Sequence, residues 1–273
     1  MTSHPLPLII EPQQLTQYLD DDRVIIVDLS KTEQYLQAHV PGAIHMDYRQ
    51  VITAKPPVMG LLPEPAQLQE IASKIGLTED KIVVAYDEEG GGKAARLLWT
   101  LDAMGHQNFS LLNGGIVAWL AEKCPIESTV NVANSQINYP IKLRETAIAR
   151  KDYILGNLKT DSVAVLDARS PYEYKGEKKF SERAGRIPGA VNMDWILLMD
   201  RENHFKLQPA EKIQAMLAEL NISTDKEVIV YCQTHHRSAL TYVVLKFLGY
   251  EKLRGYPGSW SEWGNLPDTP VEL

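Results

Sequence analysis

The sequence predicts an α/β fold built from two copies of one domain. Short runs of β-branched residues alternate with amphipathic helical patterns, as in mostly parallel sheets that helices cover on both faces. In the second half we expect strands at Val163–Asp167 and Val228–Tyr231, and helices at Pro209–Leu220 and Ser238–Leu248. Cys232 directly follows the second of these strands, at the carboxyl edge where such sheets form their sites.

The two halves of the chain repeat the same sequence blocks in the same order, about 145 residues apart. Self-similarity of this kind indicates two copies of one fold. The matching pairs are Val24–Asp28 with Val163–Asp167, Val40–Tyr48 with Ile187–Trp195, Lys81–Asp87 with Lys226–Cys232, and Gly114–Trp119 with Gly258–Trp263.

The stretch between the copies, from Ser128 to Arg144, is polar and lacks helical periodicity. Such a composition is typical of a linker. We therefore expect a first domain at residues 1–128, a linker at 129–145 and a second domain at 146–273.

Composition limits the function classes. A formal net charge of −7 argues against a general nucleic-acid surface, and the two cysteines exclude a disulfide scaffold. No apolar run approaches the ~18 residues of a membrane span, and the start MTSHPLPLII lacks the basic region of a signal peptide. We expect a cytoplasmic protein with no nucleic-acid or membrane partner, in a reducing compartment that keeps Cys232 usable.

The segment Cys232-Gln233-Thr234-His235-His236-Arg237 is the strongest functional signal. It places a thiol on a tight loop between a strand and the N-terminus of a helix, where backbone N–H groups and the helix dipole favour an anion. The nearby cationic side chains add to this effect, so the thiolate is favoured over the thiol. The pattern predicts a nucleophile that attacks or carries an anion, rather than an inert buried cysteine.

The individual loop residues have several alternative roles. Adjacent histidines do not have the usual spacing of metal ligands, so we expect no metal. His235 and His236 are neighbours on a tight loop and should point apart. Arg237 would either contact a substrate or tie loop carbonyls together. Cys124 has only Lys123 as a basic neighbour and is expected to be a spectator.

The first copy lacks the thiol. Asp87 stands at the position of Cys232, and Glu88 and Glu89 follow it. These carboxylates would repel an anion and cannot carry sulfur. The glycines at 90–92 suggest a flexible turn rather than a phosphate loop, because no Lys-Ser/Thr pair follows at P-loop spacing. The first copy is expected to be a structural and docking partner.

Four motifs in order carry a family resemblance: Asp167–Tyr174 (DARSPYEY), Ala184–Ala190 (AGRIPGA), the Cys232 loop, and Gly258-Ser259-Trp260. With them the chain resembles, over nearly its whole length, the tandem rhodanese family of thiosulfate sulfurtransferases, in particular a bacterial subgroup with the same loop string. The resemblance implies two rhodanese-like domains, the first of them inactive. It also implies a persulfide on Cys232 and sulfur transfer from a thiosulfate-like donor to a thiophilic acceptor such as cyanide, with no cofactor.

The resemblance also suggests the binding residues. In the family, the arginine at the position of Arg186 contacts the anionic donor; the alternative is a surface ion pair with Glu182 or Asp194. The expected substrate-binding residues are Arg186, Gln233, Thr234, His235, His236 and Arg237. The expected partners are a small anionic sulfur donor and a thiol, cyanide or protein acceptor.

Three alternatives remain open at this point. Related phosphatases place the arginine six positions after the cysteine, whereas Arg237 is five positions after Cys232, which makes a smaller cradle. The 3-mercaptopyruvate branch favours a glycine-rich, uncharged loop, unlike this one. A sulfur carrier that delivers persulfide to a protein would use the same loop.

Overall fold

The computed structural model describes residues 6–133 and 138–273. The expectations for residues 1–5 and for the middle of the linker, 134–137, lie outside these ranges. The chain forms two compact units. Unit 1 combines the residues up to Val51 with Pro63–Leu143 and Asp200–Leu207, and unit 2 combines Ile52–Leu62 with Arg144–Met199 and Gln208–Leu273.

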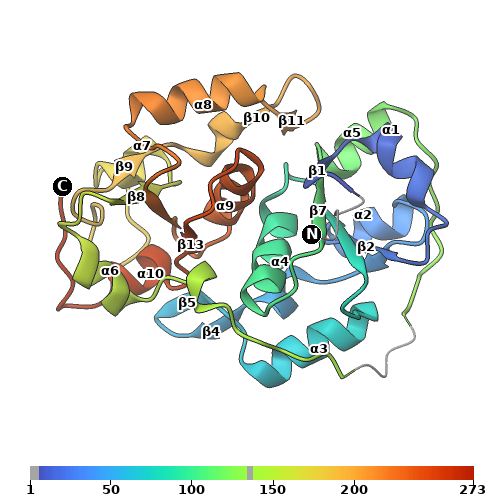
Figure 1. The fold of residues 1–273 in the computed structure, drawn as a ribbon, viewed down its shortest axis with the longest axis horizontal. Coiled ribbons are helices and arrows are strands. Elements are labelled where there is room, and N and C mark those ends of the chain that lie inside the picture. Colours follow the sequence, from blue (N-terminus) through green and yellow to red (C-terminus); the bar gives the residue numbers. More distant parts are fainter. Residues whose placement is uncertain (1–5, 134–137) are drawn as a thin grey trace. The chain divides into compact units, whose positions relative to one another are not determined.

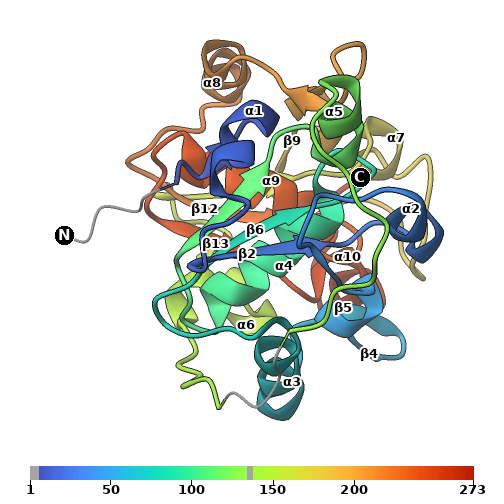
Figure 2. The same ribbon diagram turned by 90° about the vertical axis from the view of Figure 1, so that its right-hand side faces the viewer.

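Unit 1 is built around a five-stranded sheet of parallel neighbours in the order β1-β7-β6-β2-β3 (Figure 1). Its strands are β1 (Ile9–Ile10), β2 (Val24–Asp28), β3 (Ile44–His45), β6 (Ile82–Tyr86) and β7 (Phe109–Leu112). Its helices are α1 (Pro12–Leu15), α2 (Thr32–Gln37), α3 (Pro65–Ile75), α4 (Gly92–Ala103) and α5 (Gly115–Ala121), with 3₁₀ turns η1 (Thr16–Tyr18) and η2 (Tyr48–Val51). Figure 2 shows β2 and β6 side by side, with α4 packed beside β6.

Unit 2 repeats this plan with a four-stranded parallel sheet in the order β13-β12-β8-β9. Its strands are β8 (Val163–Asp167), β9 (Val191–Asn192), β12 (Glu227–Tyr231) and β13 (Leu253–Gly255). Its helices are α6 (Lys151–Asn157), α7 (Pro171–Tyr174), α8 (Ala210–Glu219), α9 (Arg237–Phe247) and α10 (Ser259–Trp263), with 3₁₀ turns η3 (Glu145–Ala147) and η4 (Trp195–Leu198). The predicted elements are confirmed to within about one residue at each end.

Apolar side chains on the strands explain why helices cover both faces of these sheets. In unit 2, Ile229 and Tyr231 of β12 are fully buried and pack with Trp260 and Trp263 of α10. In parallel strands of this kind both faces are buried, so the runs are continuously apolar rather than alternating. Tyr231 pairs in register with Asp167 of β8, which brings the carboxyl ends of the two strands together.

Each unit includes a short segment from the other half of the sequence: unit 2 includes Ile52–Leu62 of the first half, and unit 1 includes Asp200–Leu207 of the second half. The hairpin β4 (Thr53–Lys55) and β5 (Val58–Leu61) belongs to unit 2, where Met59 N–H donates to Ser261 Oγ (3.0 Å) and Ser261 Oγ donates to the Met59 carbonyl (2.9 Å).

The reciprocal segment is Asp200–Leu207, which begins at the last residue of β10 (Met199–Asp200) and ends with β11 (Lys206–Leu207). It packs in unit 1, where Lys206 pairs with Glu11 (2.7 Å) and Glu122 (2.5 Å). The simple limits 1–128 and 146–273 do not describe this exchange, and those limits stay a prediction.

Candidate active site

Cys232 lies where β12 ends, and α9 begins five residues later at Arg237. Both backbone groups of Cys232 are held: its N–H donates to Ser259 Oγ (3.3 Å), and its carbonyl accepts from the Trp260 N–H (2.9 Å). The residue is 1% exposed. Ser259 and Trp260 at the start of α10 therefore hold the backbone of Cys232 in place. The N-terminus of α9 faces the thiol, because the Ser238 N–H is hydrogen-bonded to it.

The thiol of Cys232 is acidic for a buried cysteine. Burial alone raises its pKa, but the charge of Arg237, the Ser238 hydroxyl and the backbone N–H groups of Ser238 and Thr234 outweigh burial and lower the pKa from 9.0 to about 7. A large fraction of the side chain is therefore thiolate at neutral pH. Because the thiolate is the nucleophilic form, this residue is equipped for attack on sulfur.

The two loop histidines have different surroundings. His235 is fully buried, and its Nδ1 lies 2.7 Å from Ser238 Oγ. His236 is half-buried, and its ring centroid is 5.6 Å from that of Trp195. The rings thus contact different elements, and neither lines the pocket described next.

Arg237 makes the strongest ion pair of the loop. Its two terminal nitrogens donate to the two carboxylate oxygens of Glu173, at 2.7 and 2.9 Å. Glu173 also accepts from the Ser170 hydroxyl (2.8 Å) and from the Ser170 backbone N–H (3.3 Å), and its own N–H donates to Ser170 Oγ, which forms a capping box at the start of α7. Burial opposes ionisation of Glu173, but these hydrogen bonds hold its pKa at about 2. α7 is thereby tied to the Cys232 loop.

A pocket of about 520 Å³ opens beside the loop within unit 2. Its lining residues are Pro57, Met59, Glu173, Lys178, Phe180, Gln233, Thr234, Arg237, Ser261 and Asn265. The hairpin β4–β5 thus supplies one wall. The Gln233 side-chain amide donates to Ser181 Oγ (3.1 Å) in the loop that carries Phe180. The three charged lining residues are Glu173, Lys178 and Arg237, so the pocket has an excess positive charge.

Arg186 is placed differently from the other predicted binding residues. Its guanidinium pairs with Glu272 and stacks over the Tyr174 ring, with 4.5 Å from Cζ to the ring centroid. Its backbone also bridges to Glu272 in both directions. Among the described residues, those that line the pocket do not include Arg186. The ion-pair partner is thus Glu272, not Glu182 or Asp194.

Unit 1 shows what occupies the same loop when sulfur is absent. The buried carboxylate of Asp87 accepts from the backbone N–H groups of Glu89 (2.9 Å), Gly91 (2.8 Å) and Ala94 (3.0 Å). Burial and the charge of Glu89 raise the pKa of Asp87, although these N–H groups oppose the shift. The Asp87 side chain therefore takes up these three N–H groups of the unit 1 loop.

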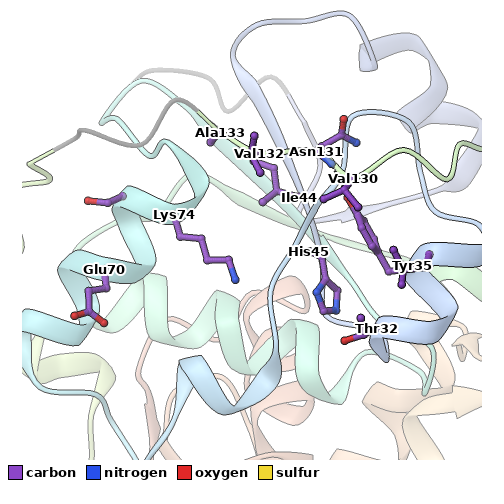
Figure 3. A pocket seen from close by; sticks show the side chains of 12 residues that line it. Thr32, Tyr35, Ile44, His45, Glu70, Lys74, Val130, Asn131, Val132 and Ala133 are labelled. Atoms are coloured by element: carbon purple, nitrogen blue, oxygen red, sulfur yellow. Dashed lines mark hydrogen bonds between the residues drawn. The ribbon is translucent and has the colours of Figure 1, made fainter.

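A second pocket, of about 590 Å³, lies in unit 1 between α2, β3 and α3 (Figure 3). Lys74 and His45 point toward its interior, while Glu70 lies on the outer side of α3. Lys74 Nζ donates to Gln50 Oε1 (2.6 Å), and His45 Nε2 bonds to the Ser30 carbonyl (2.9 Å). None of the residues that line this pocket is a cysteine.

Sequence reasoning did not single out Glu173, Lys178, Ser259 or the hairpin wall. The Ser170-Pro-Tyr-Glu173 string carries a capping-box signal, which points to a helix start but not to a pairing with Arg237. Lys178 and Met59 reach the pocket through tertiary contacts that no local pattern encodes. Within residues 6–133 and 138–273, no group of three or more potential ligands could hold a metal ion. The same ranges contain no helix that is long and apolar enough to cross a membrane.

Comparison with known proteins gives consistent relatives. Residues 11–122 and 151–266 each match the rhodanese-like domain family. The chain is 44% identical over 268 residues to a thiosulfate sulfurtransferase of Azotobacter vinelandii and 42% identical to one of Pseudomonas aeruginosa, covering 98% of both chains in each case. It is 31% identical to the sulfur carrier protein TtuD of Thermus thermophilus, covering 98% of this chain and 97% of that one.

Solved structures show the same fold at lower identity. The anaerobic ergothioneine biosynthesis enzyme from Chlorobium limicola aligns with a TM-score of 0.87 at 22% identity, covering 97% of this chain and 70% of that one. The crystal structure of YnjE aligns with a TM-score of 0.86, also at 22% identity, covering 97% of this chain and 68% of that one. With two matched domains and relatives above 40% identity along the whole chain, this protein belongs to the rhodanese family, as a member with two tandem rhodanese-like domains.

Proposed function

We propose that this protein is a thiosulfate sulfurtransferase that moves sulfane sulfur to a thiophilic acceptor through a persulfide on Cys232. The observation that carries the proposal is a thiol with a pKa of about 7, buried in a cradle of backbone N–H groups beside a positively charged pocket. The names of the relatives at 42–44% identity support thiosulfate as donor.

In the first step the Cys232 thiolate attacks the outer sulfur of thiosulfate. The S–S bond of the donor breaks, sulfite leaves with the bonding electron pair, and a cysteine persulfide remains. Lys178 at the pocket wall, together with Arg237, offsets the charge of the incoming dianion. The backbone N–H groups of Thr234 and Ser238 stabilise the anion before and after the transfer.

In the second step an acceptor removes the outer sulfur. Cyanide attacks the terminal sulfur of the persulfide, thiocyanate forms, and the Cys232 thiolate is regenerated. The protein is returned unchanged, so each turnover needs no external electron donor. A reducing compartment such as the cytoplasm would suit this chemistry, because it keeps Cys232 from forming a disulfide.

The remaining predicted binding residues enter the proposal with different roles. Gln233 and Thr234 line the pocket and are proposed to contact the donor. His235 and His236 do not line it, so we propose that they act on the loop rather than on the donor. Arg186 would have to give up its pairing with Glu272 to reach a donor, and its contribution is tested below.

Mass spectrometry tests the proposal directly. Protein treated with thiosulfate should gain a mass of about 32 Da on the peptide that contains Cys232, and cyanide should remove it with release of thiocyanate. The matched control is Cys232→Ser, which should gain no mass. A sulfur adduct on Cys124, or turnover by Cys232→Ser, would refute the assignment.

A second candidate differs in the acceptor. The relative named as a sulfur carrier protein favours delivery of the persulfide to a protein. Two results would support the sulfurtransferase. Double-reciprocal plots of the initial rate against thiosulfate at several cyanide concentrations should be parallel, and cyanide turnover should be faster than persulfide transfer to small thiols. Single-turnover loading with negligible cyanide turnover would support the carrier. A higher kcat/KM for 3-mercaptopyruvate than for thiosulfate would replace the proposed donor.

A further inference from the structure

Two loop positions of the active site have a left-handed backbone although they are not glycines. His235 has φ +54° and Ser259 has φ +49°. At the corresponding positions unit 1 has Gly90 (φ +98°) and Gly115 (φ +58°). Left-handed backbone is costly for residues with a Cβ and almost free for glycine. At these two positions unit 2 therefore carries side chains on left-handed backbone, whereas the copy without the thiol carries glycine.

Both side chains make contacts that lead to Cys232. Ser259 Oγ accepts from the Cys232 backbone N–H. His235 is buried at 0% exposure, and its Nδ1 is 2.7 Å from Ser238 Oγ. The Ser238 hydroxyl in turn hydrogen-bonds to the Cys232 thiolate. Strained backbone that is retained in this way is typical of functional sites.

We propose that His235 is a positioning residue, whose Nδ1–H donates to Ser238 Oγ and so directs the single hydroxyl proton of Ser238 toward the sulfur of Cys232. Ser238 has only one hydroxyl proton. If this proton points at the sulfur, the oxygen is free to accept, and the donor 2.7 Å away is the His235 Nδ1. The relay orients a hydrogen bond; it moves no proton during the reaction.

The charged groups near Cys232 do not orient the Ser238 hydroxyl, and this is the role that His235 fills. Arg237 acts on the thiolate by its charge and is held by Glu173. Asp167 on β8 is paired with Arg169 and accepts three hydrogen bonds from its side chain. These groups fix the field around the sulfur, whereas the Ser238 hydroxyl is a rotor that would otherwise choose between partners.

The inference rests on the proposed role of Cys232, but its test measures the thiol itself and not sulfur transfer. It can therefore fail while the sulfurtransferase proposal stands. Sulfur-free protein is prepared with cyanide, and the rate of Cys232 alkylation by iodoacetamide is followed by peptide mass between pH 5 and 10. The midpoint of this profile reports the titration of the thiol.

The decisive variant is His235→Gly, which copies Gly90. Removing the Nδ1–H should raise the midpoint by about half a unit to one unit and slow alkylation at pH 6 about three- to tenfold, with the rate at pH 10 unchanged. The thermal unfolding midpoint should stay near that of the parent, because the loss of packing is offset by relief of the left-handed strain. His235→Asn tolerates the same backbone and offers an amide donor, so it should restore part of the shift.

His204→Gly is the matched control. His204 has φ +56° and is exposed in unit 1, so the change removes a histidine and the same kind of backbone strain without touching Ser238. It should leave the alkylation midpoint unchanged. Ser238→Ala should raise the midpoint at least as far as His235→Gly does.

If His235 acts through Ser238, the effects of His235→Gly and Ser238→Ala on the alkylation midpoint should not be additive. In the Ser238→Ala background, adding His235→Gly should change the midpoint little further, because the histidine acts through the hydroxyl. An additional shift as large as in the parent would overturn the relay, as would a parent-like midpoint in His235→Gly. If His235→Gly does not fold, His235→Asn replaces it in the comparison of alkylation midpoints with Ser238→Ala. A parent-like midpoint in Ser238→Ala refutes the relay.

Discussion

Cys232 and Asp87 end corresponding strands and are held by the same kind of loop. In unit 1 the side-chain oxygens of Asp87 accept from three backbone N–H groups, so the loop is held by a group of its own chain. In unit 2 the sulfur of Cys232 receives the N–H groups of Thr234 and Ser238. A bound carboxylate is permanent, whereas a thiolate can be extended by one sulfur and then restored. At the residue scale, this difference separates a structural loop from a reactive one.

The pKa of Cys232 leads to a defined pH dependence. Because the thiolate reacts and the pKa is lowered to about 7, the rate of persulfide formation should rise about tenfold per pH unit below pH 7 and level off above it. Stopped-flow single turnovers with thiosulfate between pH 5 and 9 measure this profile. Cys124→Ser should behave like the parent, because the pKa of Cys124 is raised by burial. A plateau that begins only near pH 9 would contradict the environment described for Cys232.

Lys178 and Arg186 are the two candidate cations for binding the anionic donor, and alanine substitutions distinguish between them. Lys178 lines the pocket, so Lys178→Ala should raise the KM for thiosulfate about threefold at low salt with little change in kcat, as expected for an exposed charge. Arg186→Ala should have a smaller effect, because its guanidinium is committed to Glu272. Lys175→Ala is the matched control, since Lys175 is exposed nearby but does not line the pocket. A larger KM effect in Arg186→Ala would return the donor-binding role to Arg186.

At the scale of elements, the short helix α7 matters because it presents Glu173 to Arg237 at the start of α9. A four-residue helix has little intrinsic stability, so its capping box and this bidentate pair hold it in place. The pair also limits the directions in which the Arg237 guanidinium can point. The orientation of the cation next to Cys232 is thus set by an element more than sixty residues earlier in the chain.

The Glu173–Arg237 pair predicts a loss of stability in acid. The folded-state pKa of Glu173 is about 2, below the ordinary 4.5, so its contribution is fully present above pH 4.5 and disappears as the pH falls toward 2. Glu173→Gln should therefore lower the free energy of unfolding by about 3 kcal/mol at pH 7 and by much less near pH 2. Urea denaturation at several pH values measures this, with the exposed Glu177→Gln as control. An equal loss at pH 7 and pH 2 would refute the pairing as its cause.

The sequence predicted the strand–loop–helix around Cys232 because that signal is local: an apolar β-branched run, a polar loop and an apolar helix follow one another. The repeat likewise located Asp87 at the equivalent position. Glu173, Lys178 and Met59 were not predicted as pocket residues, because their places depend on packing between segments far apart in the sequence. The partner of Arg186 was missed for the same reason, since Glu272 lies near the end of the chain.

At the scale of the whole molecule, each unit includes a hairpin from the other half of the sequence. The hairpin β4–β5 lines the pocket of unit 2 with Pro57 and Met59, and at Gly60, whose backbone is left-handed, it passes close to Thr234 of the Cys232 loop. The unit that holds Cys232 is therefore not the second half of the chain alone. This arrangement gives the first half a direct contribution to the site even though Asp87 cannot carry sulfur.

Gly60 offers a sharp test of this contribution. A Cβ at Gly60 would lie 2.2 Å from the Thr234 carbonyl oxygen, so Gly60→Ala should displace the loop and reduce sulfur transfer by at least about tenfold. Gly42→Ala is the matched control: its φ is +76°, close to the +78° of Gly60, but a Cβ there meets nothing within 4 Å. It should cost about 1 kcal/mol of stability from backbone strain and leave the transfer rate unchanged. Equal activity in the two variants would remove the hairpin from the site.

The exchanged segments also set an order for folding during synthesis. Domains generally fold as units, starting from the N-terminal one, as the chain emerges from the ribosome. Here three polar contacts of unit 1, from Lys206 to Glu11 and Glu122 and from the Leu207 N–H to Asn113, form only when Lys206 and Leu207 have been made. A nascent chain that ends at the linker therefore has an incomplete first unit, which is completed only after β8 and most of the pocket loop around Lys178 have been translated. The segment Asp200–Leu207 is thus the last part of unit 1 to be made, and the residues of unit 1 up to Leu143 leave the ribosome well before the piece that finishes them.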